Sequence, residues 1–175
     1  MFEIKNVKIS LKIDGISLNT VLKQLEINNI LYERKNNYII IKHRYIYVIF
    51  IPKSKQINHV NITKIPILEK INDSITTFCQ NIFSNLSINV KKVCIDNLTS
   101  TFKLNHALIL SDIIKDNRDI YNLNYNNEKF PGLFIKFGEG TLILFYTGNV
   151  IAVGCKNEQN LKYLFDKLKT IVHHD

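Results

Sequence analysis

The stretch Phe130-Pro131-Gly132-Leu133-Phe134-Ile135-Lys136-Phe137, together with the segment TLILFYTGNVIAVGCK from Thr141 to Lys156, decides the fold of this chain. Both segments are rich in aromatic and β-branched residues, which predicts short strands. Thr147-Gly148 lies between two apolar runs and predicts a tight hairpin turn. Phe130 and Phe145 therefore fall at the start of one predicted strand and at the end of its neighbour.

The composition is that of a folded, basic protein. At 175 residues the chain can form one domain or two small fused units, and it can bury a core without disulfides or a structural metal. Hydrophobic residues make up 46% of the chain and charged residues 22%, which excludes a disordered protein. The formal net charge of +8 favours an anionic partner.

No targeting or membrane segment is expected. Lys42-His43-Arg44 and Pro52-Lys53 interrupt the longest apolar stretches, so no membrane helix is predicted. The N-terminal residues lack the basic-then-apolar order of a signal peptide, which predicts an intracellular protein. Isoleucine, asparagine and lysine are abundant, as in proteins from A/T-rich genomes, and a protist or a large DNA virus is the expected source.

The chain shows no catalytic or metal-binding pattern. Its cysteines are odd in number, lie far apart and form no Cys-x-x-Cys pair, which favours reduced buried thiols: Cys79, Cys94 and Cys155. His173-His174 lacks partner ligands, so a solvated tail is favoured over a metal site. Asp112, Asp116 and Asp119 lie among lysines and asparagines and are read as solvated, so neither a catalytic residue nor a cofactor is predicted.

The two halves of the chain repeat one pattern weakly. Ile4–Ser10 aligns with Val90–Asp96, and each segment predicts a first strand. An amphipathic helix is predicted next in each half, with Ser17 and Asn105 as the expected N-caps. The apolar residues that define these helices are Leu18, Val21, Leu22 and Leu25 in the first half, and Leu104, Leu108, Ile109 and Ile113 in the second.

A β-meander and a closing helix follow in both halves. The expected strands are 38–41, 45–50 and 60–63, and then 130–137, 142–146 and 150–153. The apolar stripes of the closing helices are Ile67, Ile71, Ile75 and Phe78, and Leu161, Leu164, Phe165, Leu168 and Ile171. The sequence thus predicts an α+β fold of two pseudo-symmetric βαββ(ββ)α repeats, residues 1–87 and 88–175, which form one curved antiparallel sheet with helices on one face.

An antiparallel sheet of this kind leaves its other face free. On the strand from Thr141 to Phe145, the residues expected on the free face are Thr141, Ile143 and Phe145; on the last strand they are Ile151 and Val153. An exposed surface of isoleucine, valine and phenylalanine indicates an interaction surface. The alternative is that these side chains belong to the core of a sandwich whose second layer the sequence does not reveal.

The segment from Phe130 to Lys156 resembles the second half of the DNA-binding core of TATA-box-binding proteins (TBPs). That family carries a Phe-Pro-Gly-Leu element, a strand ending in phenylalanine, a turn of a small residue and glycine, and a glycine-small-lysine element. Here these elements are Phe130–Leu133, Leu142–Phe145, Thr147-Gly148 and Gly154-Cys155-Lys156. The resemblance implies a saddle with helices on its convex face, whose underside binds and kinks A/T-rich DNA in the minor groove; this family is itself the usual example of that binding mode.

The resemblance also implies roles for single residues. Phe130 with Phe145, and Tyr38 with Phe50, would be the pairs that wedge into base steps. Basic residues would contact phosphates, and polar or apolar residues of the free face would line the groove. The implied DNA-binding residues are Asn6, Tyr38, Arg44, Phe50, Thr63, Lys92, Phe130, Lys136, Ile143, Phe145, Thr147, Ile151, Val153 and Lys156.

The chain departs from the family pattern at several positions. The family places an asparagine on the first strand of each half; Asn6 fits, but the aligned residue of the second half is Lys92. Thr63-Lys64-Ile65-Pro66 stands where the family has threonine, glycine, a small residue and lysine. Glu128 matches an acidic position that in the family contacts a IIB-type factor, whereas Asn126 replaces a second acid.

The function implied by the resemblance is that of a transcription initiation factor. Such a protein would bind and bend A/T-rich promoter DNA and recruit a IIB-like factor and the RNA polymerase machinery. It would act as a monomer or weak dimer in the nucleus, or in a cytoplasmic viral factory if the source is a virus. The alternative is a TBP-like protein-interaction module of a transcription complex with little DNA binding of its own, favoured by Lys92 and by Thr63-Lys64-Ile65-Pro66.

Overall fold

The computed structural model describes residues 3–172. The chain divides into two compact units. The first unit comprises residues 6–96, and the second comprises the residues up to Lys5 together with those from Asn97 on. The boundary predicted at residue 87 rests on a repeat in the sequence, whereas these units are defined by contacts in the structure. The repeat boundary therefore stays a prediction.

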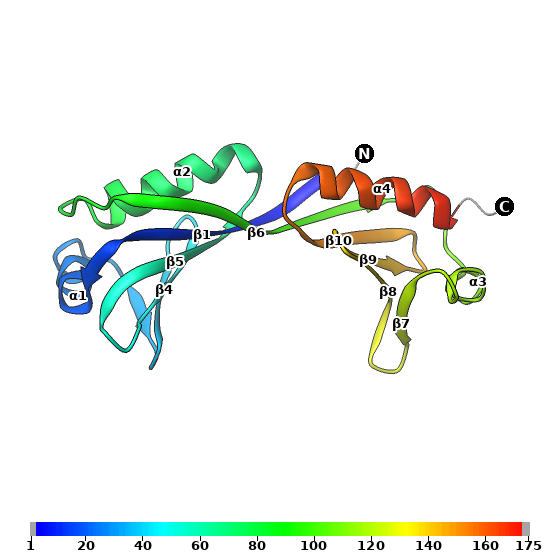
Figure 1. Cartoon of the computed structure of the whole chain (residues 1–175), viewed down its shortest axis with the longest axis horizontal. Coiled ribbons are helices and arrows are strands. Elements are labelled where there is room, and N and C mark those ends of the chain that lie inside the picture. Colours follow the sequence, from blue (N-terminus) through cyan, green and yellow to red (C-terminus); the bar gives the residue numbers. More distant parts are fainter. Residues whose placement is uncertain (1–2, 173–175) are drawn as a thin grey trace. The chain divides into compact units, whose positions relative to one another are not determined.

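The first unit is an antiparallel sheet with helices between and after its strands (Figure 1). Its strands are ordered β2-β3-β4-β5-β1. Its elements are β1 (Glu3–Ser17, whose first residues belong to the second unit), α1 (Leu18–Ile27), β2 (Tyr32–Arg34), β3 (Tyr38–Lys42), β4 (Ile46–Phe50), β5 (Gln56–Ile65), the 3-10 turn η1 (Leu68–Lys70), α2 (Ile71–Thr76) and the π-helical turn η2 (Thr77–Ile82).

The second unit repeats this order of elements. Its strands are ordered β6-β10-β9-β8-β7, also antiparallel. Its elements are β6 (Val90–Lys103, which begins in the first unit), α3 (Leu110–Asn117), β7 (Asn122–Asn126), β8 (Phe130–Phe137), β9 (Gly140–Phe145), β10 (Asn149–Cys155) and α4 (Glu158–Val172).

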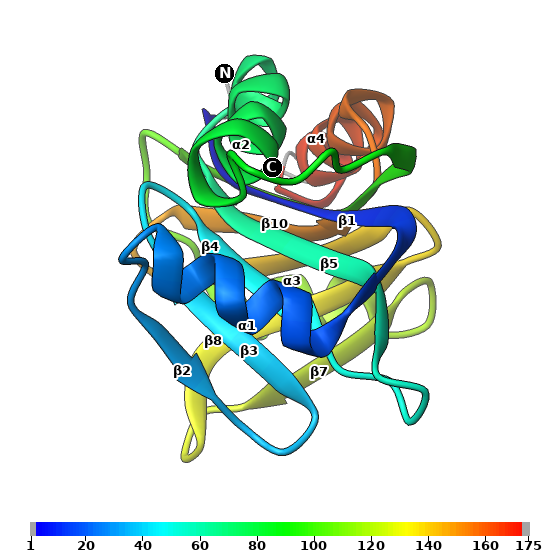
Figure 2. The same ribbon diagram turned by 90° about the vertical axis from the view of Figure 1, so that its left-hand side faces the viewer.

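Each unit buries one face of its sheet beneath its helices. In the first unit, α1 and the closing helical segment lie on the same side, and Asn28 Nδ2 donates to the Ile82 carbonyl at 2.8 Å (Figure 2). The ring of Phe78 stacks on Tyr47 of β4 at 5.6 Å. In the second unit, α4 buries its predicted stripe of Leu161, Leu164, Leu168 and Ile171 against alternate residues of the sheet. Fully burying each such side chain stabilises the fold by about 1.5–3 kcal/mol.

Most predicted elements are confirmed, and several strands extend further than the sequence pattern indicated. Ser17 caps α1 as predicted, because its Oγ accepts a hydrogen bond from the Thr20 amide at 3.1 Å. The short edge strands β2 and β7 were not predicted individually. Within residues 3–172, no helix is long and apolar enough to cross a membrane.

The prediction for the first helix of the second half is wrong in its N-terminal part. α3 begins at Leu110, and its N-cap is Ile109 rather than Asn105. The Leu104 amide donates to the Gly148 carbonyl at 2.9 Å, and the Leu108 amide donates to the Tyr146 carbonyl at 2.8 Å. These long-range bonds to the β9–β10 turn hold residues 104–108 in an irregular segment, because the backbone donors of that segment are already satisfied there.

The closing helix of the first half also differs from its predicted stripe. Ile67 precedes the helix and is 41% exposed, whereas the helix buries Ser74, Thr77, Phe78 and Ile82. The Tyr47 hydroxyl donates to the Ser74 carbonyl at 3.2 Å, so tyrosines of the sheet set which side of the helix faces inward. A pattern of isoleucines alone could not reveal this contact.

Candidate nucleic-acid interface

The second unit presents one face of its sheet that no helix covers. On β9, Leu142 and Leu144 are buried on the side of α4, whereas Thr141, Ile143 and Phe145 alternate with them and are only half-buried. Ile151 and Val153 of β10 lie on the same face, since they pair with Ile143 and Thr141. Their predicted orientation is confirmed, and no second sheet lies over this face within the described residues. We call it the open face of the second unit.

Three phenylalanine rings cluster on this open face. Phe130 and Phe145 contact edge to face with their centroids 5.7 Å apart, as the predicted wedge pair requires. Phe134, which the sequence analysis did not single out, lies 5.3 Å from Phe130. Gly132 makes room for this cluster, because a Cβ atom there would lie 2.5 Å from Cε1 of Phe130 and 2.8 Å from Cγ2 of Ile143. The glycine of the Phe-Pro-Gly-Leu element therefore leaves room for the Phe130 ring over this strand.

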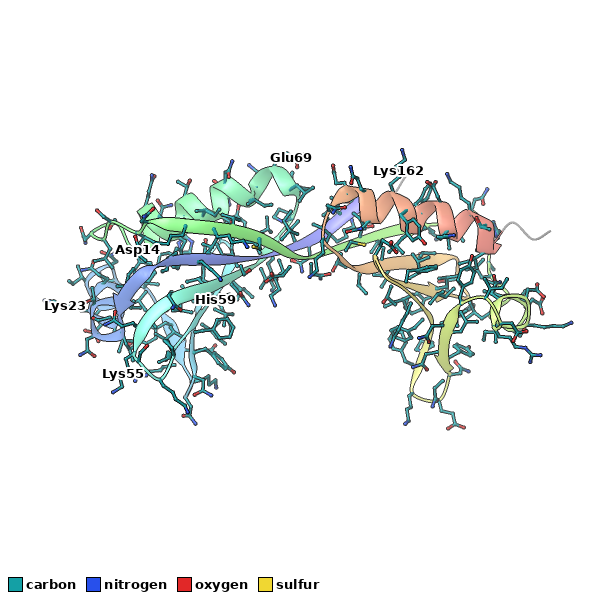
Figure 3. All side chains as sticks on the ribbon, viewed as in Figure 1. Asp14, Lys23, Lys55, His59, Glu69 and Lys162 are labelled. Carbon is teal, nitrogen blue, oxygen red and sulfur yellow. The ribbon has the colours of Figure 1, made fainter. Side chains whose placement is uncertain are left out.

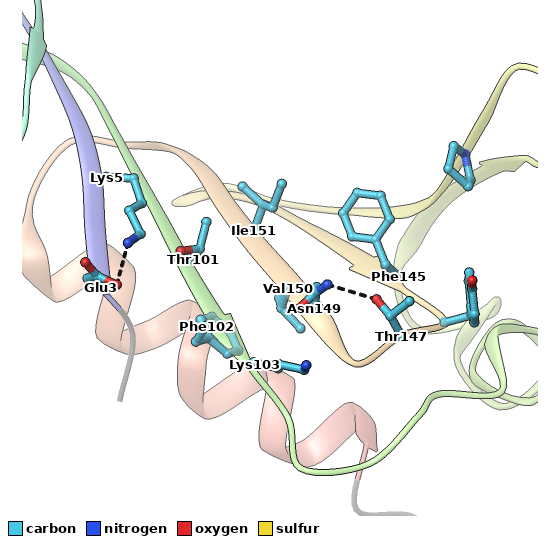
Figure 4. A pocket seen from close by; sticks show the side chains of 12 residues that line it. Glu3, Lys5, Thr101, Phe102, Lys103, Phe145, Thr147, Asn149, Val150 and Ile151 are labelled. Atoms are coloured by element: carbon cyan, nitrogen blue, oxygen red, sulfur yellow. Dashed lines mark hydrogen bonds and ion pairs between the residues drawn. The ribbon is translucent and has the colours of Figure 1, made fainter.

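A pocket of about 590 Å³ opens beside Phe145 (Figure 4). Phe145 and Ile151 form part of its apolar wall, and Figure 4 shows both side chains pointing away from α4. Thr101, Lys103 and Asn149 add polar groups to its lining. The lining also includes the ion pair of Lys5 with Glu3 (Figure 4), so it presents an acceptor as well as donors beside its apolar walls.

The predicted polar contacts of the second unit lie at the edges of this face. Lys136 is exposed and pairs across strands with Thr141. Thr147 accepts a hydrogen bond from Asn149 Nδ2 at 3.0 Å in the β9–β10 turn. Lys156 follows β10 directly, and its amide donates to Asn160 Oδ1 at 3.1 Å.

A pair of asparagines occupies matching places in the two units. Asn6 Oδ1 accepts from the Lys64 amide at 2.9 Å, and Asn97 Oδ1 accepts from the Gly154 amide at 2.6 Å. Lys64 and Gly154 both have left-handed backbones, with φ of 62° and 83°. The alignment of Asn6 with Lys92 is therefore wrong: the counterpart of Asn6 is Asn97. Lys92 is an exposed residue of β6 in the first unit.

The first unit also has an open face, but its wedge pair is built differently. Phe50 is 37% exposed and pairs directly with Tyr38. In the second unit the residue paired with Phe145 is Gly132, two residues after Phe130. Tyr38 thus stands at the place of Gly132, which corrects its alignment with Phe130. The chain turns at residues 35–37, where the Lys35 amide donates to the Tyr38 carbonyl at 2.9 Å, so no strand residue precedes Tyr38 there.

Arg44, the predicted phosphate contact of the first half, has its side chain on the helical side of the sheet, beside α2. Its guanidinium forms an ion pair with Asp73 of α2 at 3.1 Å and lies over the Tyr45 ring. Burial, together with a hydrogen bond from its hydroxyl to Asp73, raises the pKa of Tyr45. By register the counterpart of Lys136 is Lys42, four residues after Tyr38, and Lys42 pairs with Glu33 at 2.6 Å.

Two further predicted residues occupy separate places. Thr63 is half-buried on β5, where it pairs with Ile46 of β4 on the open face. Glu128 is exposed in the turn between β7 and β8. In that turn Asn126 accepts hydrogen bonds from the Lys129 amide, through its carbonyl at 3.1 Å and its side chain at 3.3 Å. Asn126 thus stabilises the turn that presents Glu128.

Comparisons with known proteins find similarity to one family over the second half of the chain. A profile described as "Transcription factor TFIID (or TATA-binding protein, TBP)" matches residues 92–174. A TATA-box-binding protein of Thermoplasma acidophilum is 30% identical over 80 residues, which are 45% of this chain and 43% of that protein. The match therefore spans less than half of that relative. The structure of Methanococcus jannaschii TBP has a TM-score of 0.80 at 24% identity and covers 99% of both chains.

The fold over nearly the whole chain is that of a TBP, and the second half carries the sequence pattern. Over residues 92–174 the chain is similar to the TATA-box-binding protein family, and the predicted α+β fold is confirmed over nearly the whole chain. The matched profile describes a non-enzymatic transcription factor, in agreement with the prediction that this chain is not an enzyme. Among residues 3–172, no group of three or more His, Cys, Asp or Glu is placed to hold a metal; His173-His174 lies outside the described residues.

Proposed function

We propose that this chain is a transcription initiation factor that binds A/T-rich promoter DNA through the minor groove and bends it. Each unit contributes its open face. The observation that carries the proposal is the cluster of Phe130, Phe134 and Phe145 on a sheet face without helices. A monomer rarely leaves such an aromatic surface without a partner.

The chemistry of the open face suits an A/T-rich minor groove. Wedging rings must unstack base steps, and pyrimidine–purine steps such as TA unstack at the lowest cost. Ile143, Ile151 and Val153 offer no acceptor to a guanine amino group, so a G·C pair would lose a hydrogen bond to water without gaining another. Lys136 and Lys156 would contact phosphates at the edges.

A partner surface completes the proposal. Glu128, held out by the β7–β8 turn, would contact a basic side chain of a IIB-like factor that brings in the polymerase machinery. The replacement of a second acid by Asn126 removes one charge from this contact. We expect the purified chain to bind DNA weakly, in the roughly micromolar range of non-specific binders, and more tightly when its cognate factor is added. The nucleus, or a viral factory, stays the expected compartment.

A salt and sequence titration tests the DNA proposal. If about four to six phosphates are contacted, affinity for an A/T-rich duplex should fall on the order of a hundredfold or more between about 50 and 200 mM salt. A G/C-rich duplex of equal length is the matched control and should bind more weakly at each salt concentration. Absence of duplex binding at the lowest salt would refute the proposal.

A protein-interaction module is the second candidate function. The open face of the first unit favours it, because Arg44 lies toward the helices and no phenylalanine precedes Tyr38. In that case the aromatic cluster would hold a protein segment rather than base steps. Substituting Phe130 would then abolish binding to that protein while leaving any residual DNA affinity unchanged.

A further inference from the structure

The open faces of the two units differ at one pair of equivalent positions, where a polar residue in the first unit replaces an apolar residue in the second. Asn61 pairs with Ser10, the fourth residue after Asn6, and Ile151 pairs with Thr101, the fourth residue after Asn97. Both residues also lie three before the left-handed residue of their strand. Asn61 is therefore the counterpart of Ile151. An amide stands in the first unit where the second unit has an apolar side chain.

The side chain of Asn61 is oriented by a neighbour on the same strand. His59 Nε2 lies 3.0 Å from Asn61 Oδ1. An amide oxygen can only accept, so this hydrogen bond requires a proton on Nε2 of His59. Within residues 3–172, the only side-chain hydrogen bond found for Asn61 is this one, and its side-chain amide nitrogen donates to no described residue. Its two N–H groups are therefore available to a ligand on the open face.

His59 lies on β5 of the first unit, where Figure 3 labels it, and contacts residues of both neighbouring strands. Its ring contacts the Phe50 ring at a centroid distance of 5.2 Å. On its other side it pairs across strands with Lys12, whose ammonium group can only donate and so cannot accept the Nε2 proton. The counterpart of His59 by register is Asn149, which pairs with Lys103. The arrangement of Phe50, His59 and Asn61 thus belongs to the first unit alone.

We propose that Asn61, positioned by His59, contributes to DNA sequence specificity. Its amide would donate hydrogen bonds to minor-groove acceptors of A·T pairs bound by the first unit. This inference rests on the proposed function, since it needs DNA on the open face. Adenine N3 and thymine O2 accept in the minor groove, whereas a G·C pair adds a donor that would oppose the amide N–H groups. The second unit, with Ile151, selects against guanine only by excluding its amino group.

Atomic substitution in the DNA tests the inference directly. Each adenine of an A/T-rich duplex is replaced in turn by 3-deazaadenine, which lacks the N3 acceptor, and binding is measured at constant low salt. With the unaltered chain, at least one replacement should weaken binding about three- to tenfold, as expected for one hydrogen bond. The variant Asn61→Ile, which copies Ile151, should be insensitive at that position. Asn72→Ile, the same replacement at an exposed asparagine of α2, is the matched control and should keep the full sensitivity.

The positioning role of His59 has its own readout. His59→Ala keeps the Asn61 donor but frees its amide to rotate, so sensitivity to 3-deazaadenine should fall to an intermediate value while the unfolding midpoint stays close to that of the unaltered chain. Equal sensitivity of the unaltered chain and Asn61→Ile at every adenine would overturn the inference. So would tighter binding to G·C than to inosine·C at that position, which would mean that the amide oxygen points outward. If the unaltered chain binds no duplex at all, the proposed function itself is refuted.

Discussion

Replacing the two wedge phenylalanines by alanine should impair DNA bending far more than folding. A fully buried phenylalanine costs about 3–5 kcal/mol when truncated to alanine. Phe130 is 39% exposed and its ring contacts those of Phe134 and Phe145, so we expect Phe130→Ala to lower the free energy of unfolding by only about 2 kcal/mol. Phe145 is half-buried and should behave similarly.

Phe78→Ala is the matched control for a core ring. Phe78 is 1% exposed and contacts Tyr47 at 5.6 Å and Phe83 at 5.1 Å, so its loss should fall in the full range of about 3–5 kcal/mol. Urea unfolding measures these losses, and energy transfer between dyes at the two ends of an A/T-rich duplex measures bending. The wedge assignment is wrong if Phe130→Ala and Phe145→Ala unfold the chain as severely as Phe78→Ala while the remaining folded protein still bends DNA normally.

The remaining predictions concern backbone geometry and the paired asparagines. Gly148→Ala should destabilise the second unit by about 2–3 kcal/mol or more in urea unfolding, because φ is +81° and a Cβ would lie 2.2 Å from the His106 carbonyl oxygen; an unchanged midpoint would contradict this. Lys64→Gly should stabilise the first unit by up to about 1 kcal/mol in thermal unfolding, since φ is 62° and glycine removes that strain; destabilisation would show that the lysine side chain contributes contacts. Asn97→Ala should lower affinity for A/T-rich DNA about as much as Asn6→Ala, roughly tenfold; a loss confined to Asn6→Ala would restore the asymmetry that the alignment with Lys92 suggested.

Local patterns in the sequence predicted most of the fold for a simple physical reason. The period of two in β9 separates Leu142 and Leu144 from Ile143, and the period of 3.6 in α4 gathers its leucines on one side. Both patterns depend only on neighbours along the chain. The start of α3 could not be read this way, because the backbone of residues 104–108 bonds to the distant β9–β10 turn.

The DNA-binding roles of the candidate site residues stay predictions, but the structure shows where sequence alignment located equivalent positions correctly and where it did not. Alignment by apolar residues placed Val90–Asp96 against Ile4–Ser10 and so concealed Asn97. A better signal lies in spacing: Asn6 and Lys64 are 58 residues apart, and Asn97 and Gly154 are 57 apart. The ion pair of Arg44 could not be predicted from the sequence, because its partner, Asp73, is distant in sequence and approaches only through the packing of α2 on β4.

The two open faces imply a division of roles between the units. The open face of the second unit is apolar, and apolar contact depends on shape. It would therefore favour any base step of the DNA that opens enough to accept Phe130 and Phe145. The face of the first unit carries Asn61 and His59, whose polar groups lose water on binding and regain hydrogen bonds only over bases that present acceptors. If the proposed function holds, we therefore expect a mismatch to cost more beneath the first unit, although the second unit should contribute more of the affinity. On the proposed function, the departures of the first unit from the TBP pattern change how it selects DNA, from the shape of the groove to hydrogen bonds with the bases. The first unit would then still bind DNA.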